Sequence, residues 1–399
     1  MKEQIEAEAR AAAAATRALN DNSVSVALAT AGGMVDEHAD RIAAANALDM
    51  EAATDLDEGT RDRLRLDEAR IAAIAEQLRD LANLPPLDRV EDAWLLANGL
   101  QVEVRRIPIG AVGANFEARP NVAVDVAGQL LKSLNAAVLR TGGAALRTVT
   151  FLVDQILRPA LDAAGLPPEA VGLVRTPERE GARILVSLPE LLPLVILRGS
   201  GETTAALARE AAQHGVRTLA HAEGGGVLYL HVDADPAKVE ALITASLDRL
   251  GVCNRLNLLL AHDGVEVPYA LLESLGITVR EPKRIGHEWA NDPERIASVT
   301  VKTVSSLDEA VVIANSETSG LAATIVTESP EAAQQFLDAY RGTAAYWNAP
   351  TRFTDGFALT GAPETGINVD RVPGPRGPVT YRDLYLRQYR VVGDGTQHR

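Results

Sequence analysis

The stretch that decides the fold is residues 109–143, which read IGAVGANFEARPNVAVDVAGQLLKSLNAAVLRTGG. Residues 109–116 predict a buried strand, residues 121–133 predict a helix with an apolar face, and residues 136–140 predict a second buried strand. The glycines at positions 142 and 143 mark a turn at the end of that strand. This order predicts two parallel strands joined by a helix that covers the sheet.

The same alternation continues outward along the chain. A long helix is expected over residues 144–161 and another over residues 239–250, while the first 80 residues, rich in Ala, Glu, Arg and Leu, predict several helices. The other strands are expected at residues 100–108, 171–174, 194–197, 217–219, 227–232, 296–303, 322–327 and 385–392. Strands that alternate with helices define an α/β protein with a parallel sheet covered on both faces.

Length and composition limit what the protein can be. A chain of 399 residues is too long for one hydrophobic core, which predicts roughly two or three domains. The net charge of −15 argues against a nucleic acid or an anionic membrane as partner, because both bind basic surfaces. No stretch approaches the roughly 20 apolar residues that cross a bilayer.

The chain has a single cysteine, Cys253, between two long apolar segments. A lone cysteine cannot form an internal disulfide and cannot by itself build a thiolate metal site. Its open roles are a buried small hydrophobic residue and a nucleophilic or redox thiol. The second role predicts covalent catalysis, because the thiolate attacks electrophilic carbon.

Several other kinds of catalytic centre have no counterpart in the sequence. The seven histidines have no metal-binding spacing, so no metal site is expected, and there is no nucleophile elbow, Walker loop or strict dinucleotide fingerprint. Two glycine turns follow predicted strands, at residues 140–143 and 198–202. Such turns let backbone N–H groups approach a phosphate or a nucleotide, although they also occur as ordinary connections.

Residues 105–122, RRIPIGAVGANFEARPNV, resemble the signature of the gamma-glutamyl phosphate reductases, also called glutamate-5-semialdehyde dehydrogenases. This family belongs to the aldehyde dehydrogenase superfamily. Further similar segments follow in the same order, at residues 131–143, 197–201, 250–254, 348–356 and 389–395. The resemblance covers residues 5–395, which is nearly the whole chain.

The resemblance implies an α/β, aldehyde dehydrogenase-like fold with three parts. Residues 1–225 would form the N-terminal helices and a Rossmann-type cofactor-binding domain, and residues 226–360 an α/β catalytic domain with Cys253. Residues 96–108 and 375–399 would form a small oligomerisation flap and the C-terminal strand.

The resemblance also implies an activity, the NADPH-dependent reduction of L-glutamyl 5-phosphate to L-glutamate 5-semialdehyde in proline biosynthesis. The Cys253 thiolate would attack the acyl phosphate, expel phosphate and form a thioester. The oxyanion donors would be the Cys253 N–H and either Arg119 or Asn121, unless Arg119 binds the departing phosphate. Asn348 and Arg352 would contact the substrate. The residues along the cofactor would be Arg140, Thr141, Gly142, Gly143, Gly199, Ser200, Gly201 and Glu202.

Two departures from the family leave the substrate more open than the chemistry. Gly226 and Val227 stand near the positions of a family Cys-His pair, and residues 315–323 resemble the generic aldehyde dehydrogenase pattern. The alternatives are therefore the same chemistry on another acyl phosphate or carrier-bound acyl group, or a non-catalytic partner subunit. A base for hydrolysis also stays open, because His221 stands where hydrolytic relatives carry a glutamate and Glu223 is close by.

The expected partners follow from the same resemblance. The substrate would be a small acyl phosphate, a glutamate kinase could pass it on directly, and the flap predicts a homodimer or homotetramer. The choice between NADP and NAD stays open. The charged N-terminal segment without a signal-peptide pattern and the single cysteine predict a cytoplasmic protein.

Overall fold

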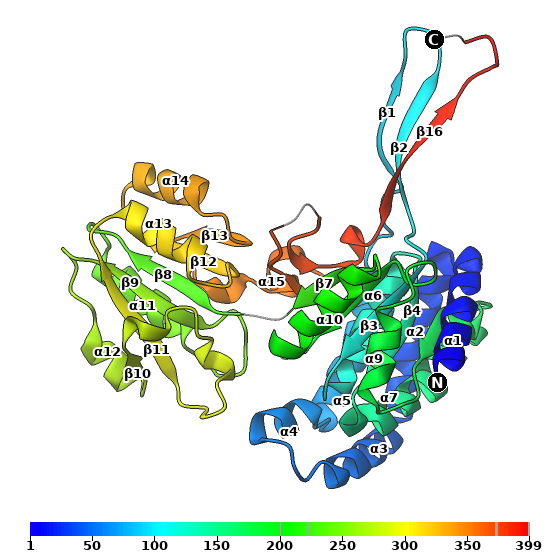
Figure 1. Ribbon diagram of the computed structural model, residues 1–399, viewed down its shortest axis with the longest axis horizontal. Coiled ribbons are helices and arrows are strands. Elements are labelled where there is room, and N and C mark those ends of the chain that lie inside the picture. Colours follow the sequence, from blue (N-terminus) through cyan, green and yellow to red (C-terminus); the bar gives the residue numbers. More distant parts are fainter. Residues whose placement is uncertain (200, 222–223, 372–373, 398–399) are drawn as a thin grey trace.

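The computed structural model describes residues 1–199, 201–221, 224–371 and 374–397, and it contains two separate parallel sheets and a projecting antiparallel ribbon (Figure 1). The first sheet has five parallel strands in the order β5-β4-β3-β6-β7. They are β3 (Ala111–Phe116), β4 (Ala136–Thr141), β5 (Val171–Leu173), β6 (Leu194–Arg198) and β7 (Arg217–His221). The strand order reverses at β3, and ligands bind beyond the carboxyl ends of the strands at such a switch point.

The unit predicted from residues 109–143 is present. Helix α6 (Pro120–Lys132) joins β3 to β4, and Gly113 lies opposite Val138 in the parallel register. Every residue of both strands is buried. A Cβ at Gly113 would lie 3.0 Å from Val195 Cγ2 on β6, so the closely packed centre of the sheet leaves no room for a side chain there.

Five helices precede the first strand, as the composition of the N-terminal region predicted. They are α1 (Lys2–Ala15), α2 (Asp21–Glu37), α3 (Ala39–Ala52), α4 (Glu58–Leu64) and α5 (Glu68–Asn83). Asp57 begins α4 by accepting a hydrogen bond from the Thr60 N–H at 3.0 Å. Helix α5 packs tightly on α6, since a Cβ at Gly128 would lie 2.8 Å from Leu81 Cδ2. The N-terminal helices therefore share the core of the first sheet.

The prediction of one continuous helix over residues 144–161 is wrong, because the structure divides this segment into several elements. A 3₁₀ turn η2 (Gly143–Ala145) leads into α7 (Leu146–Leu152), a π-helical turn η3 (Val153–Leu157) and α8 (Arg158–Ala163). Pro159 has no N–H to donate to the carbonyl of Gln155, and its ring would collide with that carbonyl in a regular helix. A wider π turn before the proline relieves the collision. The first sheet is completed by α9 (Arg179–Leu185) and α10 (Gly201–Gln213).

The second sheet has six parallel strands in the order β10-β11-β9-β8-β12-β13. They are β8 (Gly226–Leu230), β9 (Leu256–His262), β10 (Thr278–Arg280), β11 (Ser298–Val304), β12 (Ala322–Val326) and β13 (Ala344–Trp347). The helices of this half are α11 (Pro236–Ser246), α12 (Tyr269–Ser274), α13 (Leu307–Ser316) and α14 (Pro330–Ala339). One hydrophobic cluster lies on each face of the sheet, so it forms a core distinct from that of the first sheet.

The last part of the chain returns to the first sheet and then leaves it as a ribbon (Figure 1). Helix α15 (Gly356–Thr360) precedes the pair β14 (Gly366–Asn368) and β15 (Gly377–Val379), and β14 lies beside β7. The ribbon consists of β1 (Val90–Leu95), β2 (Gln101–Ile107) and β16 (Leu386–Val392), all antiparallel. The proposed domain limits at residues 225 and 360 stay a prediction.

Short 3₁₀ turns complete the element order: η1 (Thr16–Ala18), η4 (Pro168–Ala170), η5 (Pro282–Arg284), η6 (Trp289–Asn291), η7 (Thr351–Phe353) and η8 (Tyr381–Asp383). Within the described residues, no helix is both long enough and apolar enough to cross a membrane.

Candidate active site

Cys253 lies in the loop between α11 and β9, and hydrogen bonds hold this loop on both sides of the cysteine. Before it, the Gly251 N–H donates to a carbonyl oxygen of η6 at 2.9 Å. After it, the buried side chain of Asn254 donates to the carbonyl oxygens of Arg352 and Thr354, each at 3.0 Å. The loop is therefore fixed, as positioning of a nucleophile requires.

A run of three glycines, residues 224–226, packs directly against this loop. The Gly225 N–H donates to the Cys253 carbonyl at 2.6 Å, and Gly225 has a φ of +111°. A Cβ at Gly224 would lie 2.6 Å from Cys253 Cβ and would also collide with Glu288 Oε1. The side chains of Cys253 and Glu288 thus converge over Gly224, an approach that only a residue without Cβ allows.

Cys253 opens into a cavity of about 470 Å³, called here the cysteine cavity. The turn after β3 and the glycine turn after β6 form one wall, with Arg119 and Gly199 among their residues. Helix α4 contributes Arg63, and the segment around η6 contributes Glu288. Both halves of the molecule therefore build the space in front of the thiol.

A second cavity, of about 490 Å³, shares Arg63, Arg119 and Arg198 with the first. It lies among α4, α5, the first turn of α6 and residues 249–252. We call it the arginine cavity, because seven arginines line it: Arg63, Arg65, Arg70, Arg119, Arg198, Arg249 and Arg295. Its one acidic residue, Asp62, forms an ion pair with Arg70 at 3.0 Å. In a chain with a net charge of −15, this concentration of positive charge marks a site for anions.

Arg119 reaches the cavities through a strained turn. Ala118 has a φ of +41°, which is unfavourable for a residue with a Cβ, and it turns the chain between β3 and α6. Burial, Arg198 and Arg63 lower the pKa of Arg119 to about 10. Arg119 remains a cation at neutral pH, and its guanidinium group forms no hydrogen bond or ion pair within the described residues. The predicted site residues Cys253 and Arg119 are thus brought together.

The thiol of Cys253 is held in its neutral form in the free protein. Burial, with Glu288 and Glu364 beside it, raises the pKa of this thiol to about 12. Arg198 and Arg119 act in the opposite direction, because a cation stabilises the thiolate. Reactivity of the cysteine therefore depends on the balance between these carboxylates and guanidinium groups.

Asn121, the other predicted oxyanion donor, lines the arginine cavity but not the cysteine cavity. Its side-chain amide donates to Asp125 Oδ2 at 3.1 Å, one turn along α6. Burial raises the pKa of Asp125 to about 7, although Arg198 and Asn121 oppose the shift. The second oxygen of Asp125, Oδ1, is buried without a hydrogen-bond partner among the described residues.

Arg140, predicted to lie along the cofactor, makes structural contacts at the end of β4. It is 5 % exposed and donates to Asn115 Oδ1 at 3.2 Å and to the carbonyl oxygens of Pro177 and Glu178 at 3.1 and 2.9 Å. Burial lowers the pKa of its guanidinium group. Arg140 thus fixes the loop after β5 to the end of the strand, and Thr141 next to it is fully buried.

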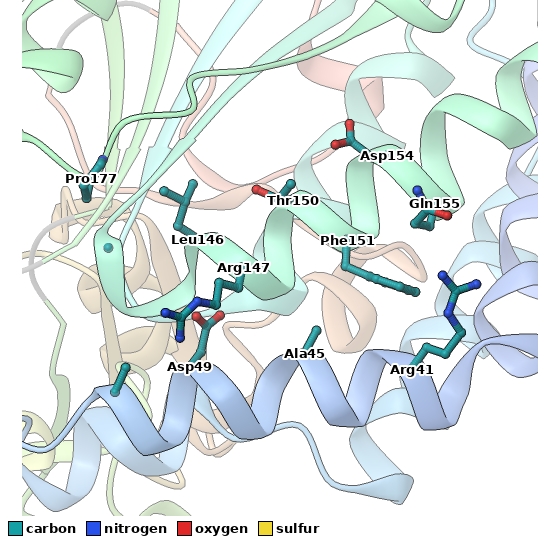
Figure 2. Close-up of a pocket in the computed structure, with 12 residues that line it drawn as sticks. Arg41, Ala45, Asp49, Leu146, Arg147, Thr150, Phe151, Asp154, Gln155 and Pro177 are labelled. Atoms are coloured by element: carbon teal, nitrogen blue, oxygen red, sulfur yellow. The ribbon is translucent and has the colours of Figure 1, made fainter.

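Gly143 lines a groove of about 710 Å³ between α3 and α7 (Figure 2), and Gly142 directly precedes it in the turn. A Cβ at Gly142 would meet nothing within 4 Å, which leaves room for a ligand beside the turn. Figure 2 shows Arg147 extending toward Asp49 at one end and Arg41 beside Phe151 at the other. The predicted cofactor turn therefore adjoins a groove that contains two arginines.

The second predicted cofactor turn faces the cysteine cavity through Gly199 and Gly201. Glu202 is exposed on the first turn of α10. Ser200 lies outside the described residues, as do Glu223 and the side chain of His221. The cofactor role of Ser200 therefore stays a prediction. Whether His221 or Glu223 acts as a base for hydrolysis also stays open.

The two predicted substrate residues, Asn348 and Arg352, do not line either cavity. Asn348 donates to the Thr327 carbonyl at 2.9 Å and so joins β12 to β13. Arg352 forms an ion pair with Asp248 at 2.8 Å and also donates to Asn254 Oδ1. Through these contacts Arg352 holds the loop that carries Cys253 in place. Contact of Asn348 or Arg352 with the substrate stays a prediction.

Most residues that line the cysteine cavity were not predicted from the sequence, and the charged ones among them include Arg63, Arg198 and Glu288. Arg198 is the first residue of the predicted glycine turn at residues 198–202, which was a usable signal. Arg63 and Glu288 lie in segments without a motif, and only the tertiary fold brings them to Cys253.

The chain belongs to the aldehyde dehydrogenase family, whose sequence model matches residues 1–292 and 298–377. It is 34% identical over 378 residues to a gamma-glutamyl phosphate reductase of Ligilactobacillus salivarius, an alignment that covers 90% of this chain and 89% of the relative. It is 33% identical over 416 residues to gamma-glutamyl phosphate reductase 2 of Bacillus licheniformis, with 98% and 97% covered.

A solved structure agrees with these relatives. The crystal structure of gamma-glutamyl phosphate reductase from Thermotoga maritima matches with a TM-score of 0.90 at 28% identity, and the match covers 99% of this chain and 100% of that one. The predicted family resemblance and the aldehyde dehydrogenase-like α/β fold are confirmed.

Proposed function

We propose that the protein reduces L-glutamyl 5-phosphate to L-glutamate 5-semialdehyde and phosphate, a step of proline biosynthesis. The observation that carries this proposal is the wall of the cysteine cavity. It holds Arg63, Arg119 and Arg198, none of which forms an ion pair with a carboxylate in the described parts of the chain. A nucleophile beside unpaired guanidinium groups fits a substrate whose carbonyl carries a phosphate leaving group. The names of the relatives support the same substrate.

The reaction begins with loss of the Cys253 proton. Because the pKa of the thiol is about 12, the thiol is protonated at neutral pH in the free protein. Glu288, which meets Cys253 over Gly224, is suited to accept this proton, and Arg119 and Arg198 stabilise the thiolate that remains. Attack on the acyl phosphate then forms a thioester and releases phosphate.

The tetrahedral intermediate of this attack needs hydrogen-bond donors for its oxyanion. The N–H groups of Cys253 and Asn254 donate to no oxygen of the described residues, so both are free to serve. We assign Arg119 to the oxyanion and Arg198 to the departing phosphate. Asn121 is the weaker candidate, because its amide is engaged with Asp125.

A nicotinamide cofactor, which members of this family use, would supply the hydride that reduces the thioester. The residues at the predicted turns fit such a group. Thr141 Oγ1 is buried without a hydrogen-bond partner among the described residues, and the space beside Gly142 is open. Gly199 and Gly201 would bring the reactive end of the cofactor into the cysteine cavity, where the thioester is held.

NADPH is the cofactor that we propose, on the basis of the groove beside Gly143. Proteins that bind NAD place an acidic residue near the end of the second strand for the ribose hydroxyl, whereas an arginine there accommodates the 2′-phosphate of NADP. Residues 140–147, RTGGAALR, contain no acid and two arginines. Arg140 is engaged structurally, but Arg147 is exposed, and its guanidinium group donates a hydrogen bond to the Leu48 carbonyl at 3.0 Å.

Among the described residues, the carboxylates of this groove form no ion pair with Arg41 or Arg147, although Asp49 lies near Arg147. Asp49 accepts hydrogen bonds from Thr148 N and Oγ1 at 2.8 and 2.7 Å, and burial raises its pKa. Asp154 is paired with Arg175 at 2.7 Å. The groove therefore keeps positive charge available for a phosphate group (Figure 2).

The function is tested in the reverse direction, by phosphate-dependent reduction of NADP with glutamate-5-semialdehyde, which exists largely as its cyclic form. We expect activity in the wild type and none in Cys253→Ala, while Cys253→Ala still binds NADPH. Activity without phosphate would instead indicate a hydrolytic dehydrogenase. No activity from a folded protein that binds the nucleotide would refute the proposed substrate.

The cofactor preference has its own test, which needs no turnover. Calorimetry should show that 2′,5′-ADP binds more tightly than 5′-AMP, which lacks only the 2′-phosphate, and that Arg147→Gln weakens binding of the first about tenfold and leaves the second unchanged. Arg17→Gln, a change of another exposed arginine, serves as the control. Equal binding of both nucleotides by the wild type would contradict the preference for NADPH.

We also propose that the chain acts as a cytoplasmic homodimer or homotetramer joined through the ribbon of β1, β2 and β16. The support is the set of large apolar residues exposed on this ribbon, among them Trp94, Leu95 and Tyr389. Transfer of the unstable acyl phosphate from a glutamate kinase remains part of the proposal. Light scattering of the wild type and of Leu95→Glu would test the assembly.

A further inference from the structure

Asp125 carries a carboxyl group beside the active site that takes no part in the chemistry described above. It lies on α6, one turn after Asn121, and lines neither the cysteine cavity nor the arginine cavity. Asn121 donates to its Oδ2 at 3.1 Å, whereas Oδ1 is buried and has no hydrogen-bond partner among the described residues. A buried carboxyl oxygen without a donor is unfavourable, so its presence here calls for a physical reason.

Arg198, the last residue of β6, has the complementary property. It lies on the wall that the two cavities share, and the proposed function assigns it to the departing phosphate. Its Nε is buried and donates to no oxygen of the described residues. Strand β6 pairs with β3, and α6 follows β3 after a short turn. One buried donor and one buried acceptor without partners are therefore carried by neighbouring elements.

The two side chains are close enough to influence each other. Arg198 lowers the pKa of Asp125, and Glu364, from the segment between α15 and β14, raises it. Arg198 also lowers the pKa of the Cys253 thiol. Because Arg198 lines both cavities and Asp125 lines neither, Asp125 lies behind the cavity wall that Arg198 forms.

We propose that Asp125 is a positioning residue for Arg198: when phosphate is bound, Asp125 is ionised and its Oδ1 accepts a hydrogen bond from Arg198 Nε. A guanidinium group has five N–H donors in one plane. With Nε held from behind, the Nη donors are directed into the cavity, where they can bind two oxygens of a phosphate group. This role rests on the proposed function and adds to it a residue that touches neither substrate nor thiol.

The role of Asp125 depends on its charge. Burial raises the pKa of Asp125 to about 7, so about one carboxyl group in ten is ionised at pH 6 and about nine in ten at pH 8. A neutral carboxyl group accepts a hydrogen bond from a guanidinium group more weakly than a carboxylate does. Phosphate binding should therefore improve as pH rises through 7, in addition to any effect of the titration of phosphate itself.

The test measures kcat/KM for inorganic phosphate in the reverse reaction, with glutamate-5-semialdehyde and NADP at saturation. At pH 8, Asp125→Asn should lower this constant about tenfold, mainly through the KM for phosphate, and should leave the KM for NADP unchanged. At pH 6 the loss should be only about twofold, because few of the carboxyl groups are then ionised. The ratio of wild type to variant cancels the titration of phosphate.

A double-mutant cycle shows whether Asp125 acts through Arg198. Arg198→Lys keeps the positive charge but places a methylene group where arginine has its Nε–H. In the Arg198→Lys background, Asp125→Asn should cause no further loss of kcat/KM for phosphate. Asp370→Asn is the matched control, because burial also raises the pKa of Asp370 but this residue lines neither cavity, and it should leave the KM for phosphate unchanged.

Thermal melting verifies that each variant is folded. If Asp125→Asn does not fold, Arg198→Lys alone decides, since it should lose the rise of kcat/KM between pH 6 and pH 8 that the wild type shows. An unchanged constant in Asp125→Asn at pH 8, equal losses at both pH values, or additive losses in the double variant would overturn the positioning role and leave the proposed reaction standing.

If the wild type shows no phosphate-dependent activity, the proposed function fails, and calorimetry with inorganic phosphate at pH 8 decides the positioning role separately. Weaker binding by Asp125→Asn and by Arg198→Lys, without addition of the two effects in the double variant, supports the role. Unchanged binding in Asp125→Asn, or no binding by the wild type, overturns it.

Discussion

The state of the Cys253 thiol gives a prediction that can be tested without substrate or cofactor. Cys253 is the only cysteine of the chain, so iodoacetamide labels a single known thiol. The rate of labelling measures the thiolate fraction, since the thiolate is the reactive form. With a pKa of about 12, roughly one thiol in ten thousand is ionised at pH 8, compared with about one in ten at a pKa of 9.

The labelling rate should therefore rise tenfold for each pH unit up to the limit of protein stability, without a plateau near pH 9. Glu288→Gln removes a negative charge beside the thiol, so the pKa of Cys253 should fall and labelling at pH 8 should become about tenfold faster. Arg119→Gln should have the opposite effect, because it removes a cation that favours the thiolate.

The assay is mass spectrometry of the intact protein after timed exposure to iodoacetamide at constant ionic strength between pH 7 and pH 10. Glu266→Gln, which changes a carboxyl group outside both cavities, is the matched control and should label like the wild type. A plateau below pH 9.5 in the wild type, or slower labelling of Glu288→Gln, would refute the reasoning about charge at the thiol.

Three further predictions concern the frame of the site. Gly226→Ala should destabilise the fold by about 1–3 kcal/mol in denaturant unfolding, because the new Cβ would lie 2.8 Å from Thr351 Cβ; an unchanged midpoint would contradict this packing. Arg352→Ala should lower kcat about tenfold with little change in KM, and Asp248→Asn should reproduce part of the loss, since both changes loosen the cysteine loop; a rise in KM alone would indicate substrate contact instead. The pKa of Asp125 is about 7 in the folded state, compared with an ordinary value of 3.8. Between pH 3.8 and pH 7 the folded state therefore binds a proton at Asp125 that the unfolded state has lost, so the free energy of unfolding falls as pH rises through this range. Asp125→Asn should therefore reduce the drop in Tm between pH 5 and pH 8, and an unaltered drop would show that Asp125 is not the cause.

Much of the fold could be predicted because each element is encoded locally. The strands β3 and β4 are short apolar runs bounded by turn residues, and Pro120 begins α6 at a position that proline favours. A strand was also predicted at residues 385–392, where the structure has β16 (Leu386–Val392). The interruption of the helix at Val153–Leu157 was missed because its cause, Pro159, acts on the preceding turn.

The site could be predicted only where a motif is contiguous in sequence. Cys253 and Arg119 were found in this way, and the structure brings them to the same cavity. The cationic wall could not be found, because Arg63 lies about 190 residues before the cysteine in a helix with no sequence signature. Glu288 was missed because the segment in which it lies has no sequence signature either. For Arg140 and Arg352, the sequence could not distinguish contact with a ligand from a hydrogen bond to backbone or side chain.

The pairing of strands in the ribbon determines how the ribbon can form while the chain is being synthesised. Its central strand β2 pairs on one side with β1, which is a neighbour in sequence, and on the other with β16, from Ile107 opposite Leu386 to Gln101 opposite Val392. During synthesis, the β1–β2 hairpin emerges early and keeps one edge open until residue 392 has been added. A chain shortened before residue 386 would keep that edge permanently, in a position to pair with the same edge of another copy.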